Sequence, residues 1–357
     1  MSAPLPDLCV GPDCPIRDAV TLINRNAKGI ALVTDTERHL LGTITDGDVR
    51  RALMENLSLE SPVSELLTRK VARYIRPVTA LAGTSESTLL QLMHEHVIHQ
   101  IPLLDAAQRV VDLVTLDELL GNEPLPMQAV IMAGGFGKRL LPLTEETPKP
   151  MLPVGDRPLM ERTIQQLREA GIRRVNVTTH YLPEKITDHF GDGAAFGVEL
   201  NYVQEETPLG TAGALGLMAA PSEPLLVING DLLTRVNYRA MLAWHREHRA
   251  DLTVAVRRFS MQVPYGVIDA EDGHVTAVRE KPDVHFLVNA GIYLLEPSVY
   301  QFIEAGERSD MTDLIHRLLE EKRTVSSFLI HEYWLDIGKH DDYLRAQVDA
   351  SEGTFDL

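Results

Sequence analysis

The sequence predicts an α/β protein in which a domain with a mostly parallel central sheet follows a smaller, repeated α/β unit. Three observations lead to this fold class. Apolar strand-like segments alternate with helical segments after residue 126, and a unit of helix, strand, strand and helix occurs twice before residue 121. Between these two patterns stands a Gly/Pro-containing stretch, GNEPLP. At 357 residues, the chain is long enough for two or three domains.

The repeated unit is visible in two segments of similar pattern. Residues 29–53 read GIALVTDTERHLLGTITDGDVRRAL, and residues 100–120 read QIPLLDAAQRVVDLVTLDELL. Each has an apolar strand, a polar turn and a second strand that ends in threonine, followed by a helix with an acidic first turn. Amphipathic segments at 16–26 and 85–97 predict a helix before each pair of strands.

The first repeat carries the pattern G-x-x-T-x-x-D at Gly42, Thr45 and Asp48. This pattern resembles cystathionine β-synthase-type (CBS) domains, which occur in tandem pairs and commonly bind adenosine nucleotides. The resemblance implies that the Thr45 hydroxyl approaches phosphate and that Asp48 accepts hydrogen bonds from ribose. The alternative is that both residues cap the following helix.

The second repeat is degenerate, because it keeps Thr115 but has Glu118 in place of the aspartate. We therefore expect one adenine-nucleotide site per chain, and we expect the exposed faces of the repeats to favour a homodimer. The expected organisation is a tandem CBS pair at residues 1–122 (about 8–57 and 67–122), a linker at 123–126 and a second domain at 127–357.

The second domain shows β-α alternation. Predicted helices include residues 159–170 and 237–248. The predicted strands are residues 129–132, 175–179, 200–203, 225–228, 252–256, 291–295 and 325–329. Alternation of this kind is typical of a sheet whose strands run mostly parallel.

Composition excludes two classes of partner. The formal net charge is −17, which argues against binding of nucleic acid or of an anionic membrane, because clustered Lys and Arg hold such surfaces. No stretch approaches about twenty continuous apolar residues, and no signal-peptide pattern begins the chain. With only two cysteines, the composition fits a reducing compartment, and we expect a cytoplasmic protein.

A glycine-rich stretch, MAGGFGKRL, follows the first predicted strand of the second domain at residues 132–140. It lacks the third glycine of a dinucleotide-binding turn and also fails the P-loop pattern. A purely structural turn is one interpretation. Three glycines beside Lys138 and Arg139 favour the other, which is close approach of the backbone to an anion.

The whole stretch GGFGKRLLPLTEETPKPMLPV resembles the signature of sugar-phosphate nucleotidyltransferases, and mannose-1-phosphate guanylyltransferases in particular. Six further elements of that family follow in its order: ETPLGTAGA (206–214), NGD (229–231), PYGVI (264–268), EKP (280–282), NAGIY (289–293) and WLDIG (334–338). The resemblance covers residues 127–350 and implies a Rossmann-like, glycosyltransferase-A-like domain. In this family, a sugar 1-phosphate oxygen attacks the α-phosphorus of a nucleoside triphosphate and expels pyrophosphate.

The resemblance assigns roles to the residues around the phosphates. The backbone of Gly134, Gly135 and Gly137 is expected to accept the nucleotide. Arg139 is expected to neutralise the departing pyrophosphate, and Lys149 to lie near the α-phosphate and the sugar phosphate. For Lys149 the alternative is a solvated surface lysine, but the flanking prolines restrict its loop.

Two carboxylates match the metal ligands of the family. Asp231 follows an apolar strand, where open α/β sheets bind ligands, and Asp336 follows Trp334-Leu335 near another strand end. Mg²⁺ between phosphates needs one or two carboxylates. We therefore expect Mg²⁺ as the cofactor, although an isolated aspartate at a strand end is also an ordinary turn residue.

The resemblance places the sugar phosphate at four further positions. These are Gly266, Glu280, Lys281 and Asn289. A surface charge is the alternative for Glu280 and Lys281, and a strand-end cap is the alternative for Asn289. The isolated residues His180, His189 and His331 are interpreted as structural histidines.

The base is expected to lie near the loop that carries Glu205, Gly210 and Thr211. Many uridylyl- and thymidylyltransferases have glutamine where this chain has Glu205. A carboxylate accepts two hydrogen bonds, which suits the N1–H and N2–H donors of guanine, so GTP is the expected donor. Glu206 is the alternative carboxylate, and some uridylyltransferases share a similar loop.

The sugar cannot be identified from these residues. Fusion of a CBS pair to such a domain resembles the guanylyltransferases of nonulosonic (legionaminic) acid pathways, whose substrate is glucosamine 1-phosphate. Two alternatives stay open: a transferase that makes a UDP- or other NDP-sugar, and a catalytically silent protein that senses nucleotides. The retained Arg139, Lys149, Asp231 and Asp336 argue against the second.

Overall fold

The computed structural model describes residues 8–26, 28–70, 76–96, 98–120 and 124–353, and they form two compact units. The first unit is Met1–Leu125 and the second is Pro126–Leu357. Residues 121–123, which include the start of the predicted linker, lie outside the described residues, as does Val97 at the end of a predicted helix. Each unit is considered by itself below.

The two repeats of the first unit fold in the same way. In each, a short strand pairs in parallel with a second strand, which pairs antiparallel with a third. The first repeat contains β1 (Cys9–Val10), α1 (Ile16–Asn26), β2 (Ile30–Thr34), β3 (Leu40–Thr45), α2 (Asp46–Met54) and α3 (Val63–Thr68). The second contains β4 (Ala80–Leu81), α4 (Glu86–His96), β5 (Gln100–Leu104), β6 (Val110–Thr115) and α5 (Leu116–Leu120). The helices predicted at 16–26 and 85–97 thus correspond to α1 and α4.

A shared apolar core joins the repeats. Leu8, Ile30 and Leu32 of the first repeat form one buried cluster with residues of the second, namely Leu104, Val110 and Leu113. A backbone bridge also connects His39 with Arg109. Burial of apolar surface between two small units stabilises both, because neither is large enough to bury a sizeable core alone.

The second unit is built on a seven-stranded sheet in the order β11-β10-β7-β12-β17-β14-β18. Only β17 runs antiparallel to its neighbours, so the sheet is mostly parallel, and the predicted α/β fold class is confirmed. The strands are β7 (Gln128–Met132), β10 (Arg174–Thr179), β11 (Glu199–Gln204), β12 (Leu225–Asn229), β14 (Leu252–Gln262), β17 (Asp283–Leu295) and β18 (Val325–Ile330).

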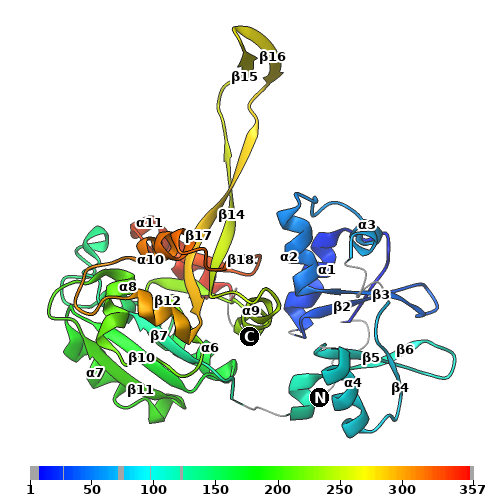
Figure 1. Ribbon diagram of the computed structural model, residues 1–357, viewed down its shortest axis with the longest axis horizontal. Coiled ribbons are helices and arrows are strands. Elements are labelled where there is room, and N and C mark those ends of the chain that lie inside the picture. Colours follow the sequence, from blue (N-terminus) through cyan, green and yellow to red (C-terminus); the bar gives the residue numbers. More distant parts are fainter. Residues whose placement is uncertain (1–7, 27, 71–75, 97, 121–123, 354–357) are drawn as a thin grey trace. The chain divides into compact units, whose positions relative to one another are not determined.

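Five helices of eight or more residues accompany this sheet in the described part of the unit (Figure 1). They are α6 (Leu159–Glu169), α7 (Pro183–Phe190), α9 (Tyr238–Glu247), α10 (Met311–Glu320) and α11 (His340–Ser351). The predicted helices at 159–170 and 237–248 are α6 and α9. Helix α10 packs Met311, Leu314 and Leu318 into a fully buried core on the sheet, which fixes the central strands.

A small second sheet, β13 (Leu232–Thr234) paired with β19 (Trp334–Asp336), lies beyond the end of β12. Its apolar side joins Leu233, Leu335 and Ile337 in a buried cluster with residues from the segment after the glycine turn. This packing holds two stretches that are about a hundred residues apart in sequence against each other.

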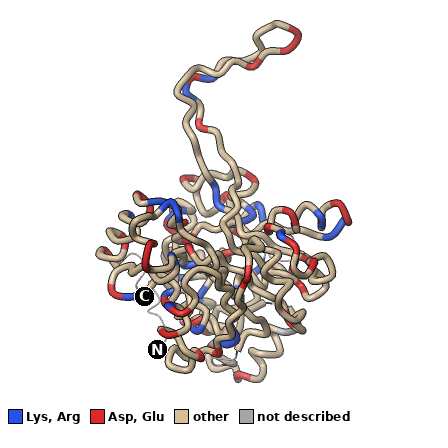
Figure 2. Tube along the Cα trace, turned by 90° about the vertical axis from the view of Figure 1, so that its left-hand side faces the viewer, with Lys and Arg blue, Asp and Glu red and all other residues tan. Residues whose placement is uncertain are grey.

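Strands β14 and β17 are longer than predicted. They continue past the sheet as a two-stranded ribbon, which carries the hairpin β15 (Val267–Glu271) and β16 (His274–Arg279) at its far end (Figures 1 and 2). The predicted strands 252–256 and 291–295 cover only the parts within the sheet. The extension was missed because its residues alternate between polar and apolar instead of forming one apolar run.

No helix in the described residues is both long enough and apolar enough to span a bilayer.

Candidate functional site

The two predicted carboxylates are brought together by the β13–β19 ladder. Leu232, directly after Asp231, pairs with Asp336 across this ladder, and the Ile337 amide donates to the Asp231 carbonyl oxygen over 3.0 Å. The Gly230 amide donates to the Met132 carbonyl oxygen over 2.9 Å. A Cβ atom at position 230 would lie only 2.5 Å from that oxygen. Glycine is thus required for the Asp231 turn to lie against the end of β7.

The two carboxylates influence each other electrostatically. Desolvation raises the pKa of Asp336, and the Asp231 carboxylate raises it further, while Lys149 and Arg139 oppose both effects. Oδ1 of Asp231 is buried and has no hydrogen-bond partner among the described residues. A buried carboxylate oxygen without a partner, beside a second carboxylate, suits a divalent cation with oxygen ligands.

Lys149 completes this charged group. Its Nζ lies 2.5 Å from Oδ2 of Asp231, and its side chain is only 11% exposed. Pro148 has extended backbone dihedrals, and a short 3₁₀ turn, Lys149–Met151, begins after it. Restricted prolines on both sides hold the backbone of Lys149 in one conformation. The interpretation of Lys149 as a solvated lysine is therefore not favoured by the structure.

The glycine-rich turn lies beside the lysine. Gly137 has φ of 61°, and a Cβ atom there would lie 2.8 Å from Thr144 and 3.3 Å from Cβ of Lys149. Thr144 also donates its hydroxyl to the Gly137 carbonyl oxygen over 2.9 Å. In contrast, a Cβ atom at Gly135 would meet nothing within 4 Å. The turn is thus packed at Gly137 and open at Gly135, where a ligand can approach the backbone.

Arg139 reaches the same region from the first turn after the glycines. Its guanidinium nitrogens lie near Gly338, two residues beyond Asp336, and its charge lowers the pKa of Asp336. Arg139, Lys149, Asp231 and Asp336 therefore form one cluster of two cationic and two anionic groups at the carboxyl ends of β7 and β12. This is the edge at which open α/β sheets bind ligands.

Glu205 lies on the other side of the glycine turn, directly after β11, and it is buried. One carboxylate oxygen accepts the Leu209 amide over 3.0 Å. The other lies so close to Gly134 that a Cβ atom there would be 2.6 Å away. Glu206 is exposed, so burial favours Glu205 as the carboxylate that borders the turn.

Gly210 and Thr211 pack against a different segment. The Thr211 amide donates to Oδ1 of Asp310 over 3.1 Å, and its hydroxyl accepts the Met311 amide over 2.9 Å. Gly210 has φ of 78° and lies tightly against Ser309 and Asp310. The structure therefore uses Thr211 to hold the start of α10.

The comparison with known families agrees with this geometry. The sequence model of the family described as nucleotidyl transferase matches residues 128–353. This chain belongs to that family. A model of the CBS domain matches residues 1–55, which contain the first repeat from β1 to α2. The N-terminal unit of this nucleotidyl transferase therefore contains a CBS domain.

Its relatives include two kinds of guanylyltransferase. The mannose-1-phosphate guanylyltransferase of Mycobacterium tuberculosis is 34% identical over 234 residues, which cover 64% of this chain and 65% of the relative. The D-glycero-α-D-manno-heptose 1-phosphate guanylyltransferase of Aneurinibacillus thermoaerophilus is 33% identical over 227 residues, or 62% and 98% of the two chains. The chain thus spans about 65% of the length of the mannose-1-phosphate guanylyltransferases that it matches.

A solved structure shares the fold. It is a Bacillus anthracis protein described as a glucose-1-phosphate thymidylyltransferase and solved with sucrose. The match has a TM-score of 0.51 and 26% sequence identity, and it covers 63% of this chain and 95% of the other.

The β14–β17 ribbon beyond the sheet and its terminal β15–β16 hairpin together form an arm, and three residues predicted to bind the sugar phosphate lie on it. Gly266 enters β15 and Glu280 leaves β16, so they face each other across the hairpin, with Lys281 next to them. The hairpin stands at the far end of the ribbon (Figure 1). The structure therefore does not bring Gly266, Glu280 and Lys281 to the Asp231–Asp336 pair.

The fourth residue, Asn289, lies at the base of the arm. Its Nδ2 donates to the Tyr293 hydroxyl over 2.8 Å, and its Oδ1 accepts the Gly291 amide over 3.0 Å. Asn229, next to the Asp231 turn, was not singled out from the sequence. Its Oδ1 is buried without a partner in the described residues, and its Nδ2 lies against Gly291. Asn229 belongs to the NGD element, but only Asp231 of that element was predicted to be a site residue.

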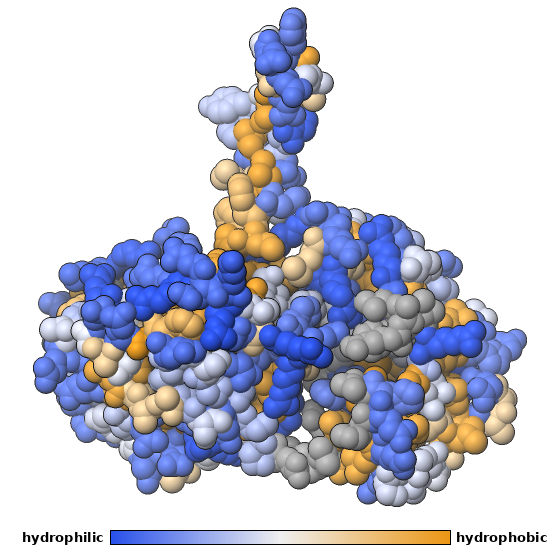
Figure 3. All heavy atoms as spheres, viewed as in Figure 1, coloured by the Kyte–Doolittle hydropathy of each residue, from blue (hydrophilic) through white to orange (hydrophobic). Residues whose placement is uncertain are grey.

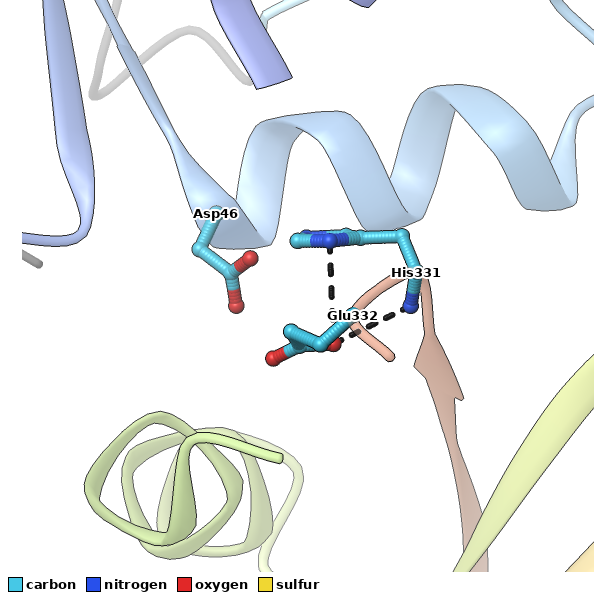
Figure 4. Close-up of side chains that lie close together, drawn as sticks. All are labelled: Asp46, His331 and Glu332. Carbon is cyan, nitrogen blue, oxygen red and sulfur yellow. Dashed lines mark hydrogen bonds and ion pairs between the residues drawn. The ribbon is translucent and has the colours of Figure 1, made fainter. Parts of the chain in front are cut away.

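His180 and His331 both make contacts with neighbouring residues. Nδ1 of His180 lies 2.8 Å from the Glu205 carbonyl oxygen, and its ring packs edge-on against Phe136. After β18, the His331 amide donates to Oε2 of Glu332 over 3.0 Å, as Figure 4 shows. Oε1 of Glu332 accepts the amide of Asn237, the residue that caps α9.

In the CBS unit, Thr45 and Asp48 form a capping box at the start of α2. Oδ2 of Asp48 accepts hydrogen bonds from the Thr45 amide and hydroxyl and lies 2.9 Å from Nζ of Lys70. Burial alone would raise the pKa of Asp48, but Lys70 and Thr45 outweigh it and lower the pKa. The structure thus shows the alternative, helix-capping role. The adenine-nucleotide site stays a prediction, since Lys70 and Arg51 both pair with the Asp48 carboxylate in this structure.

Proposed function

We propose that this chain transfers a nucleotidyl group from a nucleoside triphosphate to a sugar 1-phosphate, giving an NDP-sugar and pyrophosphate. The observation that carries the proposal is the cluster of Lys149, Asp231 and Asp336 beside an open glycine turn. In such a reaction the protein mainly positions the reactants and stabilises the charge that develops on the phosphates.

The cationic groups suit the two phosphate positions. A sugar phosphate oxygen attacks the α-phosphorus as the bond to the pyrophosphate oxygen breaks, so negative charge accumulates on the departing pyrophosphate. Arg139, exposed on the first turn after the glycines, is placed to neutralise it. Lys149 is buried at the centre of the cluster and is assigned to the α-phosphate and the sugar phosphate.

The carboxylates suit Mg²⁺. A divalent cation held by these side chains would give the buried Oδ1 of Asp231 a partner and would favour the ionised form of Asp336, whose pKa is raised. When bound, Mg²⁺ neutralises phosphate charge and favours departure of pyrophosphate. Asp231 and Asp336 would hold the ion, and Lys149 holds the Asp231 side chain through its Oδ2 atom.

Asp336 gives a prediction about stability. A carboxyl whose pKa is raised in the folded protein binds its proton more tightly there than in the unfolded chain, so the free energy of unfolding falls as pH rises through the interval between the two values. Replacing Asp336 with Asn removes this penalty. In EDTA at neutral pH, Asp336→Asn is expected to melt at or above the wild-type temperature, although its turnover falls at least tenfold.

Thermal denaturation with and without MgCl₂ checks this prediction. Mg²⁺ is expected to raise the melting temperature of the wild type more than that of Asp336→Asn. A variant that is clearly less stable than the wild type in EDTA would show that Asp336 has a structural role instead.

GTP is the proposed nucleotidyl donor. Glu205 is buried beside the glycine turn, and the Leu209 amide fixes its carboxylate. A fixed carboxylate accepts the N1–H and N2–H donors of guanine, whereas uracil and thymine offer one such donor. Two relatives act, by name, on mannose 1-phosphate and a heptose 1-phosphate as guanylyltransferases, so a GDP-sugar is the proposed product. Such a product would serve as a precursor for surface glycans or nonulosonic acids.

Exchange of pyrophosphate with each of a panel of nucleoside triphosphates, measured with the sugar 1-phosphate present, tests the base. GTP is expected to exchange at least tenfold faster than UTP, dTTP, CTP or ATP. Glu205→Gln keeps the size of the side chain but replaces one acceptor oxygen with a donor, so it should reduce the preference for GTP. Glu206→Gln, at the exposed neighbour, is the matched control and should leave the preference unchanged. A wild type that prefers UTP or dTTP would refute the guanine assignment.

A further inference from the structure

The ribbon formed by β14 and β17 has one apolar face and one polar face. One face carries Phe259, Met261, Val284, Phe286 and Val288, with Arg257 opposite Val288 at the base. The opposite face carries Arg258, Ser260, Gln262, Asp283, His285 and Leu287. On this second face the Ser260 hydroxyl lies 2.7 Å from Nδ1 of His285. Apolar and polar side chains alternate in this way along strands whose apolar face packs against another part of a protein.

The hairpin at the end of the arm repeats the pattern. Ile268 pairs with Val278, and Ala270 pairs with Val275, on one face. On the other face Asp269 and Arg279 form an ion pair at 2.9 Å. The whole arm is therefore amphipathic, and Figure 3 shows hydrophobic residues gathered along its lower part.

The apolar face is uncovered in the described chain. Phe259, Met261 and Phe286 are 49–53% exposed, and Ile268, Val275 and Val278 are 60–66% exposed. If each leaves on the order of 80–100 Å² in water, the arm presents roughly 500 Å² of apolar area. A homodimer interface needs about that much, since it buries about 800 Å² per partner, of which about 65% is apolar. An isolated two-stranded ribbon is also only marginally stable in water.

The arm's own geometry disfavours coverage by its own domain. Pairing between β14 and β17 continues without irregularity from Val256↔Asn289 to Gln262↔Asp283. Arg257, at the base, donates to the carbonyl oxygens of Glu332 and Trp334, each over 3.3 Å. Folding the arm back would break this ladder or these hydrogen bonds.

A lipid surface is also disfavoured. The end of the arm, residues 263–282, carries four acidic and two basic side chains, so its formal charge is 2 − 4 = −2. Figure 2 shows the acidic residues around this end. An anionic bilayer attracts basic segments, so it would repel this one.

We propose that the apolar face of the arm packs against the same face of a second copy of this chain. The charge on this face is Arg257, which lies opposite Val288 at the base and donates to the Glu332 and Trp334 carbonyl oxygens. Beyond the base, from Phe259 to Val284, the face is uncharged, and identical faces meet naturally around a two-fold axis. The two ribbons would stack as sheets do, about 10 Å apart. The polar faces stay in water.

The two arms would run in opposite directions, because each base joins a sheet that is wider than the ribbon (Figure 1). The paired ribbon from 256 to 262 has Phe259 at its centre. A two-fold axis there brings the far end of one ribbon, at Gln262 and Asp283, level with the base of the partner's ribbon, although the side chains of these two residues lie on the polar face. Glu280 and Lys281, just beyond Asp283, then reach the base of the partner's ribbon. In this arrangement, which rests on the proposed function, the arm of each chain supplies Glu280 and Lys281 to the site of the other chain.

Sedimentation equilibrium of the full chain tests the interface. Phe286→Lys, on the apolar face, is expected to raise the dimer dissociation constant at least a hundredfold. Leu287→Lys is the matched control, because Leu287 is the next residue, is 51% exposed against 49%, and lies on the opposite face. It should leave the dissociation constant unchanged. If Phe286→Lys and wild type associate equally, or if wild type is monomeric, the proposal is overturned.

A complementation experiment tests delivery of the residues. Asp231→Asn and Lys281→Ala chains with different affinity tags are co-expressed, and the mixed dimer is purified. If the arms serve the partner's site, one of its two sites is intact, and the mixed dimer should recover about half of the wild-type turnover. Turnover no higher than that of the single variants would overturn delivery to the partner. If wild type lacked transferase activity, the proposed function would fail, yet sedimentation would still decide the interface.

Discussion

Asp231→Asn should lower the turnover of the nucleotidyl transfer at least a hundredfold while leaving the fold intact. The side chain changes by one atom, and Asn retains the oxygen that occupies the buried Oδ1 position. What is lost is the charge that Lys149 pairs with at 2.5 Å and that we assign to Mg²⁺. Loss of charge stabilisation at one phosphate position costs about 3–4 kcal/mol in comparable sites, which corresponds to a factor of a hundred or more.

The measurement is steady-state release of pyrophosphate, with circular dichroism and the melting temperature as the test of folding. Asp156→Asn is a suitable control, because Asp156 is 68% exposed and pairs with Arg157 and Arg162, neither of which belongs to the candidate site. Its turnover should equal that of the wild type. A folded Asp231→Asn protein with near-normal turnover would remove Asp231 from the site.

Lys149→Met is expected to have an effect of similar size. Methionine keeps the apolar part of the long side chain, so packing against the glycine turn is largely retained. The ammonium group is lost, and two carboxylates then lie together without their nearest cation. Because Lys149 lowers the pKa of Asp336, its removal should raise that pKa further. The turnover should fall at least a hundredfold, and the acidic limb of the pH–rate profile should move to higher pH.

The pH–rate profile distinguishes this account from a general loss of structure. In this account, activity falls at low pH because Asp336 becomes protonated. A higher pKa of Asp336 therefore moves the acidic limb of the profile to higher pH. Lys185→Met, an exposed lysine on α7, provides the control and should leave the profile unchanged. Unchanged turnover in Lys149→Met would show that the Lys149 ammonium group takes no part in the transfer.

The fold class could be predicted because the sheet strands are short apolar runs. Strands β7, β12 and the inner part of β14 have mostly buried residues, and each was visible as such a run. The arm was not visible, because alternation of polar and apolar residues indicates a half-buried strand without saying what it packs against. Strands β14 and β17 are also held together by ten residue pairs, and such pairing cannot be seen in the sequence of either strand alone.

The candidate site could be predicted in part for a similar reason. Asp231 and Asp336 were found from motifs, but their proximity depends on the β13–β19 ladder, which joins segments about a hundred residues apart. The role of Thr45 and Asp48 was less predictable, because the same residues serve a ligand or a helix cap. Lys70, which pairs with Asp48, lies outside the motif. Only the folded chain shows which partner Asp48 has.

Direct observation of the product tests the central claim. The purified full-length chain is incubated with GTP, a panel of hexose and heptose 1-phosphates, and either MgCl₂ or EDTA, and the products are followed by phosphorus NMR. We expect the two coupled diphosphate resonances of a GDP-sugar to appear together with pyrophosphate for at least one sugar, and only with MgCl₂. If no sugar 1-phosphate gives a diphosphate-linked product with GTP, UTP, dTTP, CTP or ATP, the assignment of this site to nucleotidyl transfer is contradicted.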